Sequence, residues 1–526
     1  MTQRVIVVGA GIGGLSAAAE LALAGYQVTV LEAHTYPGGC AGTFYYQGYR
    51  FDAGATLAGG FAPGMPLDIL ARRFGIDWQA RQEAAAMQVH LTPGDSIVRW
   101  NKPDAWQEER LRQFGPQAEP FWEWQSRTAE LLWDLAKLYP AWPPQSLADL
   151  AYNVSVGWHW LLLLTRSRRI SRLPGLLRDA LTNVCRRLPP SHSERLRRFV
   201  DAQLLISAQA TSQRANALFA AAALDLSRTG VGHTPGGIGS IAWSLAEAIN
   251  RLGGVVHYRQ EVVRVRRTAR DRWRVETRRG LVLEAEQVVF NLPPPNVVAL
   301  LAEDAPSSLY RARIPKDGWG AFVLYLGVDA SIVPSGPTLH HQLLLEGPVT
   351  AGNAFFLSFS PSWDESRAPA GRRALTISTH TSLDFWWQLY ENDRIAYEQH
   401  KQAEINRILA AAERFLPGLR DATDLILSGT PVTFQRFTRR CRGWVGGYPQ
   451  THLLRTWSPR LGPGLWLVGD SIFPGQSIPA AVLGGLRVAT YILQTMIRRS
   501  AGASFTSLTV DSDAYRRPSV ITGVKP

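Results

Sequence analysis

The chain has 526 residues, of which 46% are hydrophobic and 19% charged, and its formal net charge is +13. This length exceeds that of one ordinary core and the composition is not that of a disordered chain, so we expect a folded protein of two or more domains. No apolar run approaches the roughly 20 residues of a membrane-spanning helix, and the first apolar run lacks the features of a cleaved signal peptide. We therefore expect the protein on the cytoplasmic side, either in solution or at the surface of a membrane. The three scattered cysteines have neither disulfide-framework nor metal-ligand spacing, so we expect no structural disulfide and no metal.

The amino-terminal residues predict one βαβ unit. A short apolar strand over 4–8 is followed by an alanine-rich helix over 12–24, and a second, alternating strand covers 27–31. Gly25 ends the predicted helix. This arrangement is typical of a dinucleotide-binding domain.

The glycines of this unit have the spacing of a dinucleotide-binding fingerprint. Gly9 permits the tight turn from strand to helix, Gly11 lets a pyrophosphate approach the backbone, and Gly14 allows the helix and strand to pack closely. The amino terminus of the helix faces the phosphates. Glu32 ends the second strand, where a carboxylate can bind the two hydroxyls of an adenosine ribose.

A second glycine cluster favours FAD over a nicotinamide dinucleotide. The doublet Gly38-Gly39 returns the chain toward the cofactor, and the run FDAGAT follows at 51–56. A second set of close backbone contacts indicates a ligand longer than the adenosine diphosphate half. An isolated doublet of this kind would indicate only a turn.

The other half of the predicted FAD site lies near the carboxyl terminus. An apolar strand over 465–468 ends in Gly469 and Asp470, and a loop leads into a helix that begins near Pro479. Gly469 can admit a chain of polyol carbons, Asp470 can accept a hydrogen bond from a ribityl hydroxyl, and the helix amino terminus can stabilise a reduced flavin ring. The sequence therefore predicts that both ends of the chain hold one FAD, which carries out the redox chemistry.

A strongly basic segment lies between residues 166 and 198, which contains ten arginines and only two acidic residues. Apolar residues recur in it at spacings of three and four, namely Ile170, Leu173, Leu176, Leu177, Leu181 and Val184. An apolar stripe beside a basic face favours an anionic membrane surface over nucleic acid as the partner. The nearby Trp158 and Trp160 are residues typical of such an interface. An arginine-rich surface over a helix that packs on the core is the alternative.

Five motifs are spread over nearly the whole chain. They are GGCAGTF at 38–44, FDAGAT at 51–56, TPGGIGSIAWSLAEAINRLGG at 234–254, QRFTRRCRGWVGGYPQ at 435–450 and LVGDSIFPGQSIPAAVLGG at 467–485. With them the sequence resembles the phytoene desaturase and carotenoid isomerase family of the FAD-dependent amine oxidase superfamily, and most of all its carotenoid C-3',4' desaturases. Related isomerases tend to have serine or lysine at the position of Cys40 and a DTGPS-like run in place of DAGAT, which favours a desaturase.

The resemblance implies an α/β fold in which a Rossmann-like FAD-binding domain is discontinuous and carries an inserted α+β substrate domain. The FAD-binding domain is expected over 1–65, 231–295 and 440–498, and the substrate or membrane-facing domain over 66–230 and 296–439. The polar residues 499–526 are expected to form a flexible tail. The residues expected to bind FAD are Gly9, Gly11, Gly13, Gly14, Glu32, Gly38, Gly39, Cys40, Thr43, Gly54, Ala55, Thr56, Val263, Gly469, Asp470 and Ile478.

The resemblance also implies an enzyme that introduces the C-3',4' double bond into a carotenoid, which is a long apolar polyene. One hydrogen leaves as a hydride to flavin N5 and the other as a proton that conjugation makes acidic, so the protein needs only to place the bond and exclude water. Oxygen or a quinone would reoxidise the flavin. Three alternatives remain open: a cis-trans isomerase that uses reduced FAD, another carotenoid desaturase or oxidase of the family, and a flavoprotein that binds a carotenoid or lipid without turnover.

No motif identifies a catalytic side chain, because the sequence has no HExxH, no Ser/His/Asp order and no paired carboxylates. His340, His341 and His380 are expected to be structural histidines. Arg439, in the basic motif, is a candidate to lie beside the flavin ring. A minority of the eighteen tryptophans are expected to line an apolar channel, while most fill the core.

Overall fold

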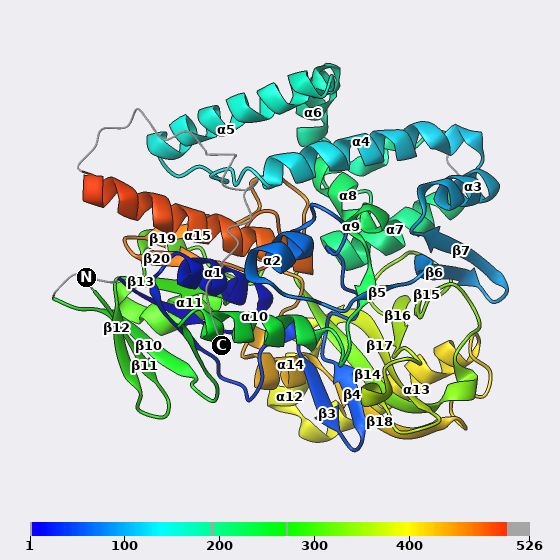
Figure 1. Ribbon diagram of the computed structural model, residues 1–526. Coiled ribbons are helices and arrows are strands. Elements are labelled where there is room, and N and C mark those ends of the chain that lie inside the picture. Colours follow the sequence, from blue (N-terminus) through cyan, green and yellow to red (C-terminus); the bar gives the residue numbers. More distant parts are fainter. Residues whose placement is uncertain (1–2, 191–193, 270–271, 502–526) are drawn as a thin grey trace, which may run out of the picture.

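The computed structural model describes residues 3–190, 194–269 and 272–501. Two main sheets form the lower half of the molecule in Figure 1, one on the left and one on the right, and most helices lie above them. Of the predicted tail, residues 502–526 lie outside the described residues, whereas 499–501 belong to the last helix.

The first sheet has six strands in the order β19-β20-β13-β1-β2-β9. Its strands are β1 (Arg4–Val8), β2 (Gln27–Leu31), β9 (Val255–His257), β13 (Gln287–Phe290), β19 (Arg460–Gly462) and β20 (Leu465–Leu467). Neighbouring strands pair in parallel, except that β19 is antiparallel to β20. The central strands are buried apolar runs, as expected for a parallel sheet that is covered on both faces.

Helices and a small sheet cover this six-stranded sheet. Helix α1 (Ile12–Leu23) packs against both α10 (Gly239–Arg251) and α15 (Ile478–Ala501). A three-stranded antiparallel sheet packs against β1 through its last strand. Its strands are β10 (Val262–Arg267), β11 (Trp273–Thr277) and β12 (Val282–Ala285). Because the strands of the six-stranded sheet come from three separate parts of the chain, the predicted discontinuous Rossmann-like α/β fold is confirmed.

The second sheet has seven strands in the order β18-β14-β17-β16-β15-β6-β7. Its strands are β6 (Ala85–Thr92), β7 (Asp95–Trp100), β14 (Trp319–Asp329), β15 (His340–Leu344), β16 (Ala354–Phe359), β17 (Arg372–Ser382) and β18 (Thr423–Gly429). All neighbours are antiparallel except β15 and β6, which are parallel. Both inserted segments therefore contribute strands to one sheet. Two short pairs complete the strands, formed by β3 (Thr43–Tyr46) with β4 (Tyr49–Asp52) and by β5 (Arg81–Gln82) with β8 (Gly232–His233).

Apart from α2 (Pro66–Phe74), the remaining helices fall into two groups. The upper group in Figure 1 comprises α3 (Pro103–Phe114), α4 (Glu119–Ala136), α5 (Leu147–Arg166), α6 (Leu173–Ala180), α7 (Glu194–Ala208), α8 (Ala217–Ala223) and α9 (Leu226–Thr229). The lower group comprises α11 (Pro294–Leu301), α12 (Leu383–Asn392), α13 (Arg394–Glu413) and α14 (Pro431–Thr438). None of the helices in the described ranges is both long and apolar enough to cross a membrane.

Helix α2 (Pro66–Phe74) begins the first inserted segment but packs against α15. Its Leu67 and Leu70 are fully buried in the same apolar core as the strands of the six-stranded sheet. The segment after residue 65 therefore starts with a helix that stabilises the nucleotide-binding part, and strands of the second sheet follow it.

Candidate functional site

A cavity of about 1300 Å³ is lined by residues of both main sheets. One part lies at the carboxyl ends of β1, β2, β13 and β20, where ligands of open α/β sheets bind. Another part reaches α12 and α13. The predicted site residues that line it are Gly9, Gly11, Gly13, Glu32, Gly38, Gly39, Cys40, Gly54, Ala55, Thr56, Gly469, Asp470 and Ile478. The fold thus brings residues from both ends of the chain into one cavity.

Bare backbone forms the cavity wall where the chain passes from β1 into α1. Gly9 has a φ of +96°, in the left-handed region that favours glycine, and its N–H donates to the Leu31 carbonyl at 2.8 Å. A Cβ on Gly11 would collide with Nδ2 of Asn291, so a larger residue there would displace the Asn291 side chain. Helix α1 begins directly afterwards at Ile12, and its first N–H groups lack intrahelical partners. We call this stretch of backbone, residues 9–12, the glycine cradle. Its free N–H groups have the chemistry that binds a pyrophosphate.

A cavity residue that was not predicted from the sequence is Asn291. It directly follows β13, and its side chain lies beside both Gly11 and Gly469. Asn291 could have been predicted from the sequence, because it is a polar residue at the carboxyl end of an apolar strand, as Glu32 is.

The Glu32 carboxylate lies in the cavity at the end of β2. One of its oxygens accepts the N–H of Ala10 at 2.7 Å, and the other accepts the N–H of His34 at 2.8 Å. Burial raises the pKa of Glu32, while these backbone hydrogen bonds oppose the shift. Both oxygens keep further lone pairs, so the fixed carboxylate can accept hydrogen bonds from the hydroxyls of a ribose.

The segment after β2 returns to the cradle, as predicted. The N–H of Gly38 donates to the Ala10 carbonyl at 2.8 Å. Gly38 has a φ of +116°, and a Cβ there would lie 2.7 Å from Cα of Gly42. The next turn is held in place by the carbonyl of Cys40, which accepts the N–H of Ala55 at 2.9 Å. The turn and the FDAGAT run therefore form one wall of the cavity.

Asp470, Arg440 and Cys40 form a polar cluster in the cavity wall, in which Asp470 and Arg440 are an ion pair. The Arg440 guanidinium lies 2.8 Å from the Asp470 carboxylate, and its Nε donates to the Trp444 carbonyl at 2.6 Å. Burial raises the pKa of the Cys40 thiol, an effect that Arg440 opposes and Asp470 reinforces. The thiol is therefore neutral at physiological pH.

Arg439 was the candidate to lie beside the flavin ring. It lines the cavity, but its neighbour Arg440 is the arginine that pairs with Asp470. Arg439 is exposed, and its Nε lies 3.5 Å from Glu261 beside β10. Its backbone has a φ of +57°, in the left-handed region, and the two arginines have different acidic partners, Glu261 and Asp470.

Two predicted contacts lie outside the cavity lining for simple geometric reasons. Val263 is 40% exposed, whereas its neighbour Val262 lines the cavity, because successive side chains of a strand point to opposite sides. Gly14 lies against the carbonyl oxygen of Gly9, where a Cβ would come within 2.6 Å. Gly14 therefore serves the close packing of helix and strand, which the fingerprint also predicts.

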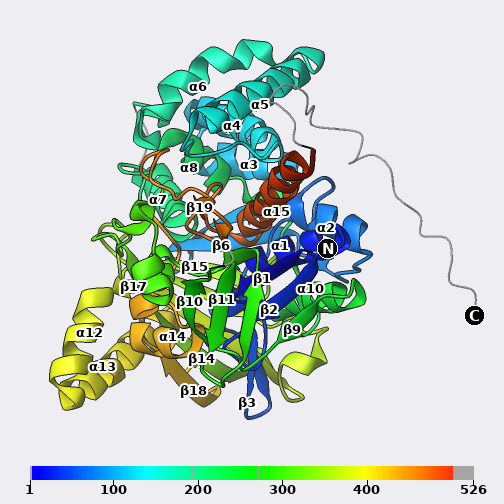
Figure 2. The ribbon, with the colours of Figure 1, turned by 90° about the vertical axis from the view of Figure 1, so that its left-hand side faces the viewer.

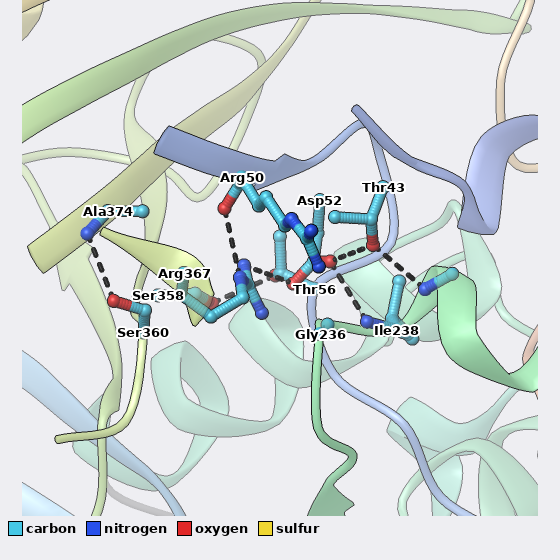
Figure 3. Close-up of polar contacts among 12 residues, drawn as sticks. Thr43, Arg50, Asp52, Thr56, Gly236, Ile238, Ser358, Ser360, Arg367 and Ala374 are labelled. Carbon is cyan, nitrogen blue, oxygen red and sulfur yellow. Dashed lines mark hydrogen bonds and ion pairs between the residues drawn. The ribbon is translucent and has the colours of Figure 1, made fainter. Parts of the chain in front are cut away.

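Thr43 also lies outside the cavity lining, in a buried polar network (Figure 3). Its hydroxyl donates to Asp52 at 2.6 Å and accepts the N–H of Gly239 at 2.8 Å. Asp52 in addition accepts the N–H of Ile238 at 2.9 Å and pairs with Arg367 at 3.0 Å. The network joins β3, β4, the start of α10 and the segment before β17, so Thr43 helps to hold these parts of the fold together.

Apolar side chains form much of the cavity wall away from the cradle. They include Met87, Val323, Ala354, Phe355, Phe356, Trp387 and Val432. All eighteen tryptophans lie in the described residues, and Trp387 is the one that lines the cavity. Buried polar groups in this wall are paired: Gln203 donates to Gln342 at 3.0 Å, and Nε2 of His380 lies 3.2 Å from Oε1 of Gln209. Such a wall suits a mainly apolar ligand.

The three candidate histidines are held neutral by burial. His380 lines the cavity, and burial lowers its pKa to about 4. His340 and His341 lie outside the cavity lining, with pKa values lowered to about 3 and about 4 for the same reason. Nδ1 of His340 lies 2.8 Å from the Ser358 hydroxyl. That hydroxyl donates to the Thr56 hydroxyl at 2.8 Å (Figure 3). His340 thus acts indirectly on the cavity wall, by positioning Thr56.

A family model described as flavin containing amine oxidoreductase matches residues 12–493. The chain belongs to this family. An oxidoreductase from Methanosarcina mazei has a similar structure, with a TM-score of 0.60 and 18% identity over 93% of this chain and 100% of that one. A putrescine oxidase bound to putrescine superposes with a TM-score of 0.58 and 17% identity over 94% of this chain and 99% of that one. These likenesses show the fold.

Curated relatives of this flavin oxidoreductase align over most of its length. Prolycopene isomerase 1 of an Oncidium hybrid cultivar is 27% identical over 502 residues, covering 92% of this chain and 82% of the relative. The prolycopene isomerase of Daucus carota is 25% identical over 509 residues, covering 92% and 79%. A neurosporene-forming phytoene desaturase of Cereibacter sphaeroides is 23% identical over 527 residues, covering 91% and 92%.

The protein is an FAD-dependent oxidoreductase, and its cavity fits that cofactor. The glycine cradle and the amino terminus of α1 would hold the pyrophosphate, and Glu32 the adenosine ribose. Gly469, with a φ of +102°, and Asp470 would hold the ribityl chain.

Proposed function

We propose that this flavin oxidoreductase introduces the C-3',4' double bond into a carotenoid. The observation that carries the proposal is that the glycine cradle and an apolar wall line the same cavity of about 1300 Å³. This volume exceeds the roughly 300–1,000 Å³ of an ordinary ligand pocket. It is consistent with a cavity that takes a long apolar substrate in addition to the cofactor.

Similarity to enzymes named for carotenoids supports a polyene substrate. Prolycopene isomerases and a phytoene desaturase align with 92% and 91% of the chain. A carotenoid is therefore the substrate class that best agrees with both the wall and the relatives.

Bound FAD supplies the acceptor for the two electrons that a desaturation removes. The apolar wall holds the polyene and excludes water, which places the reacting bond without a charged group. His380 is neutral above its pKa of about 4, so it adds no positive charge that would oppose a cation developing on the polyene. Conjugation makes the leaving proton acidic, so the wall needs no strong base.

A cis-trans isomerase that uses reduced FAD is the second candidate. The observation that favours it is the alignment of prolycopene isomerases with 92% of the chain at 25–27% identity. An isomerisation makes no net change in the number of conjugated double bonds. The two functions therefore differ in a property that can be measured directly.

Anaerobic mixing of the FAD-loaded protein with one acyclic carotenoid in detergent micelles tests the proposal. For a desaturase we expect bleaching of the flavin together with a shift of the polyene absorption to longer wavelength. Altered isomer composition with unchanged chromophore length, seen only after the flavin is first reduced, would establish the isomerase instead. Apoprotein is the control, and no change in either chromophore rejects both functions. Air and a soluble quinone, added separately to bleached enzyme, identify the electron acceptor, which we propose is oxygen or a quinone.

A further inference from the structure

We propose that α5 docks the protein on an anionic lipid membrane through a surface that we call the α5 face. This face consists of Leu147, Leu150, Val154, Trp158 and Leu162, all of which are exposed. The inference depends on the surface alone and is independent of the reaction that the cavity catalyses.

The apolar side of α5 points away from the protein. The residues of the α5 face recur at spacings of three and four, so they lie on one side of the helix. Leu147, Val154 and Trp158 are 85%, 73% and 62% exposed, whereas Val156 and Leu164 on the other side are buried. A helix on a water-facing surface normally has the opposite arrangement. The exposed apolar row therefore indicates a contact with an apolar phase or partner.

The position of α5 makes this row accessible. In both views α5 and α6 lie at the outer edge of the molecule, beyond α4 and α15 and away from the two sheets (Figures 1 and 2). The chain after α5 adds three more exposed apolar side chains, Ile170, Leu177 and Leu181. The predicted stripe over 170–184 is thus only partly exposed, since Val184 is fully buried and short helices interrupt it.

Unpaired arginines border the α5 face. Arg166, Arg168 and Arg178 are exposed and form no ion pair with any residue of the described ranges. Arg169, in contrast, lies 2.7 Å from Glu130 and is neutralised. The acidic side chains over 147–178 are limited to Asp149, at the far end of α5. Basic residues beside an apolar row complement anionic headgroups, and each contributes about 1 kcal/mol of attraction near such a surface.

A lipid surface accounts for this combination better than the other partners. A nucleic acid would pair with the arginines but leave the apolar row uncovered. A second copy of the chain would cover the row but bring like charges of the two rims together. A membrane can bury the apolar row among its acyl chains while its anionic headgroups pair with the arginines. Tryptophan, here Trp158, favours the interface between headgroups and acyl chains.

Flotation of the FAD-loaded protein with vesicles of phosphatidylcholine, with and without phosphatidylglycerol, tests the proposal. We expect the protein to float with the anionic vesicles at low salt and to be released at high salt. The double variant V154E/W158E is expected to lose at least tenfold in vesicle affinity. I395E is the matched control, because Ile395 on α13 is also 73% exposed. Flavin absorbance and melting temperature show whether each variant is folded.

Charge is tested separately with R166A/R168A, which is expected to weaken binding to anionic vesicles about 30-fold. R311A/R313A is its control, because these two arginines are also exposed. Wild-type protein that stays in solution with anionic vesicles at low salt overturns the proposal. So does equal loss of binding in V154E/W158E and I395E. A change from dimer to monomer in V154E/W158E, without an effect on flotation, assigns the α5 face to a second copy of the chain.

Discussion

Gly485 in α15 lies directly against Gly13 in α1, so that a Cβ on Gly485 would collide with the carbonyl oxygen of Gly13. On its other side Gly13 faces the backbone of Gly469, where a Cβ would come within 3.1 Å of the amide nitrogen. The last helix therefore packs on the first one backbone to backbone. This contact brings the two ends of the chain together at the cofactor cavity.

Gly485→Ala is expected to force α15 away from α1 and to lower the free energy of unfolding by about 1–3 kcal/mol, as overpacking does. Urea unfolding of the FAD-loaded protein measures this change. Gly157→Ala in α5 is the control, since no atom lies within 4 Å of a Cβ there. It is expected to stabilise the protein by about 0.5–1 kcal/mol. Equal stability of G485A and wild type would show that the two helices separate without cost.

Glu32→Gln is expected to weaken FAD binding about 10- to 100-fold, because hydrogen bonds to a charged group contribute about 1.5–3 kcal/mol. Quenching of flavin fluorescence on titration of the apoprotein measures the affinity. Wild-type affinity is also expected to fall as the pH is lowered through the raised pKa of Glu32, since protonation removes the charge. E247Q, at an exposed position on α10, is the control. Unchanged affinity in E32Q would place the ribose elsewhere.

Arg440→Met is expected to lower the free energy of unfolding by a few kcal/mol, because it leaves Asp470 largely buried without its partner. A double-mutant cycle with Asp470→Asn measures the coupling, which is expected to be about 1–3 kcal/mol. R439M, at the exposed neighbouring arginine, is expected to cost less than about 1 kcal/mol. A coupling near zero would argue against the ion pair.

Acid is expected to destabilise the protein through its buried histidines. His340, His341 and His380 have pKa values of about 3, 4 and 4 in the folded state, against about 6.5 when unfolded. Below pH 6.5 the unfolded chain therefore binds up to three more protons, and stability falls as the pH drops toward 4. The contribution of these residues is about 4 kcal/mol per pH unit at its steepest.

Urea unfolding between pH 7 and pH 5 tests this expectation with His380→Asn. Removal of one such histidine is expected to reduce the slope by about 1.4 kcal/mol per pH unit. H452N, at an exposed position, is the control for loss of an imidazole. An unaltered slope in H380N would show that His380 is protonated equally in both states.

The glycine cradle and Glu32 could be predicted because their signals are local. A tight turn, a helix start and a carboxylate after the next strand all lie between Gly9 and Glu32. Neighbouring residues were harder to tell apart. Val262 and not Val263 faces the cavity, and Arg440 and not Arg439 meets Asp470. The pleat of a strand, or one residue with left-handed backbone, decides which of two neighbouring side chains meets a given partner, and neither can be read from a short motif.

The sequence by itself determined the α/β class, the FAD fingerprint and the family, because each depends on patterns within short segments. Only the tertiary structure decided which side chains reach the cavity and which hold the fold together. Thr43, for example, bonds Gly239 across 196 positions, and Asp52 bonds Arg367 across 315. The exposure of the α5 face was also decided by the tertiary structure, because the elements that pack against a helix determine which of its sides is buried.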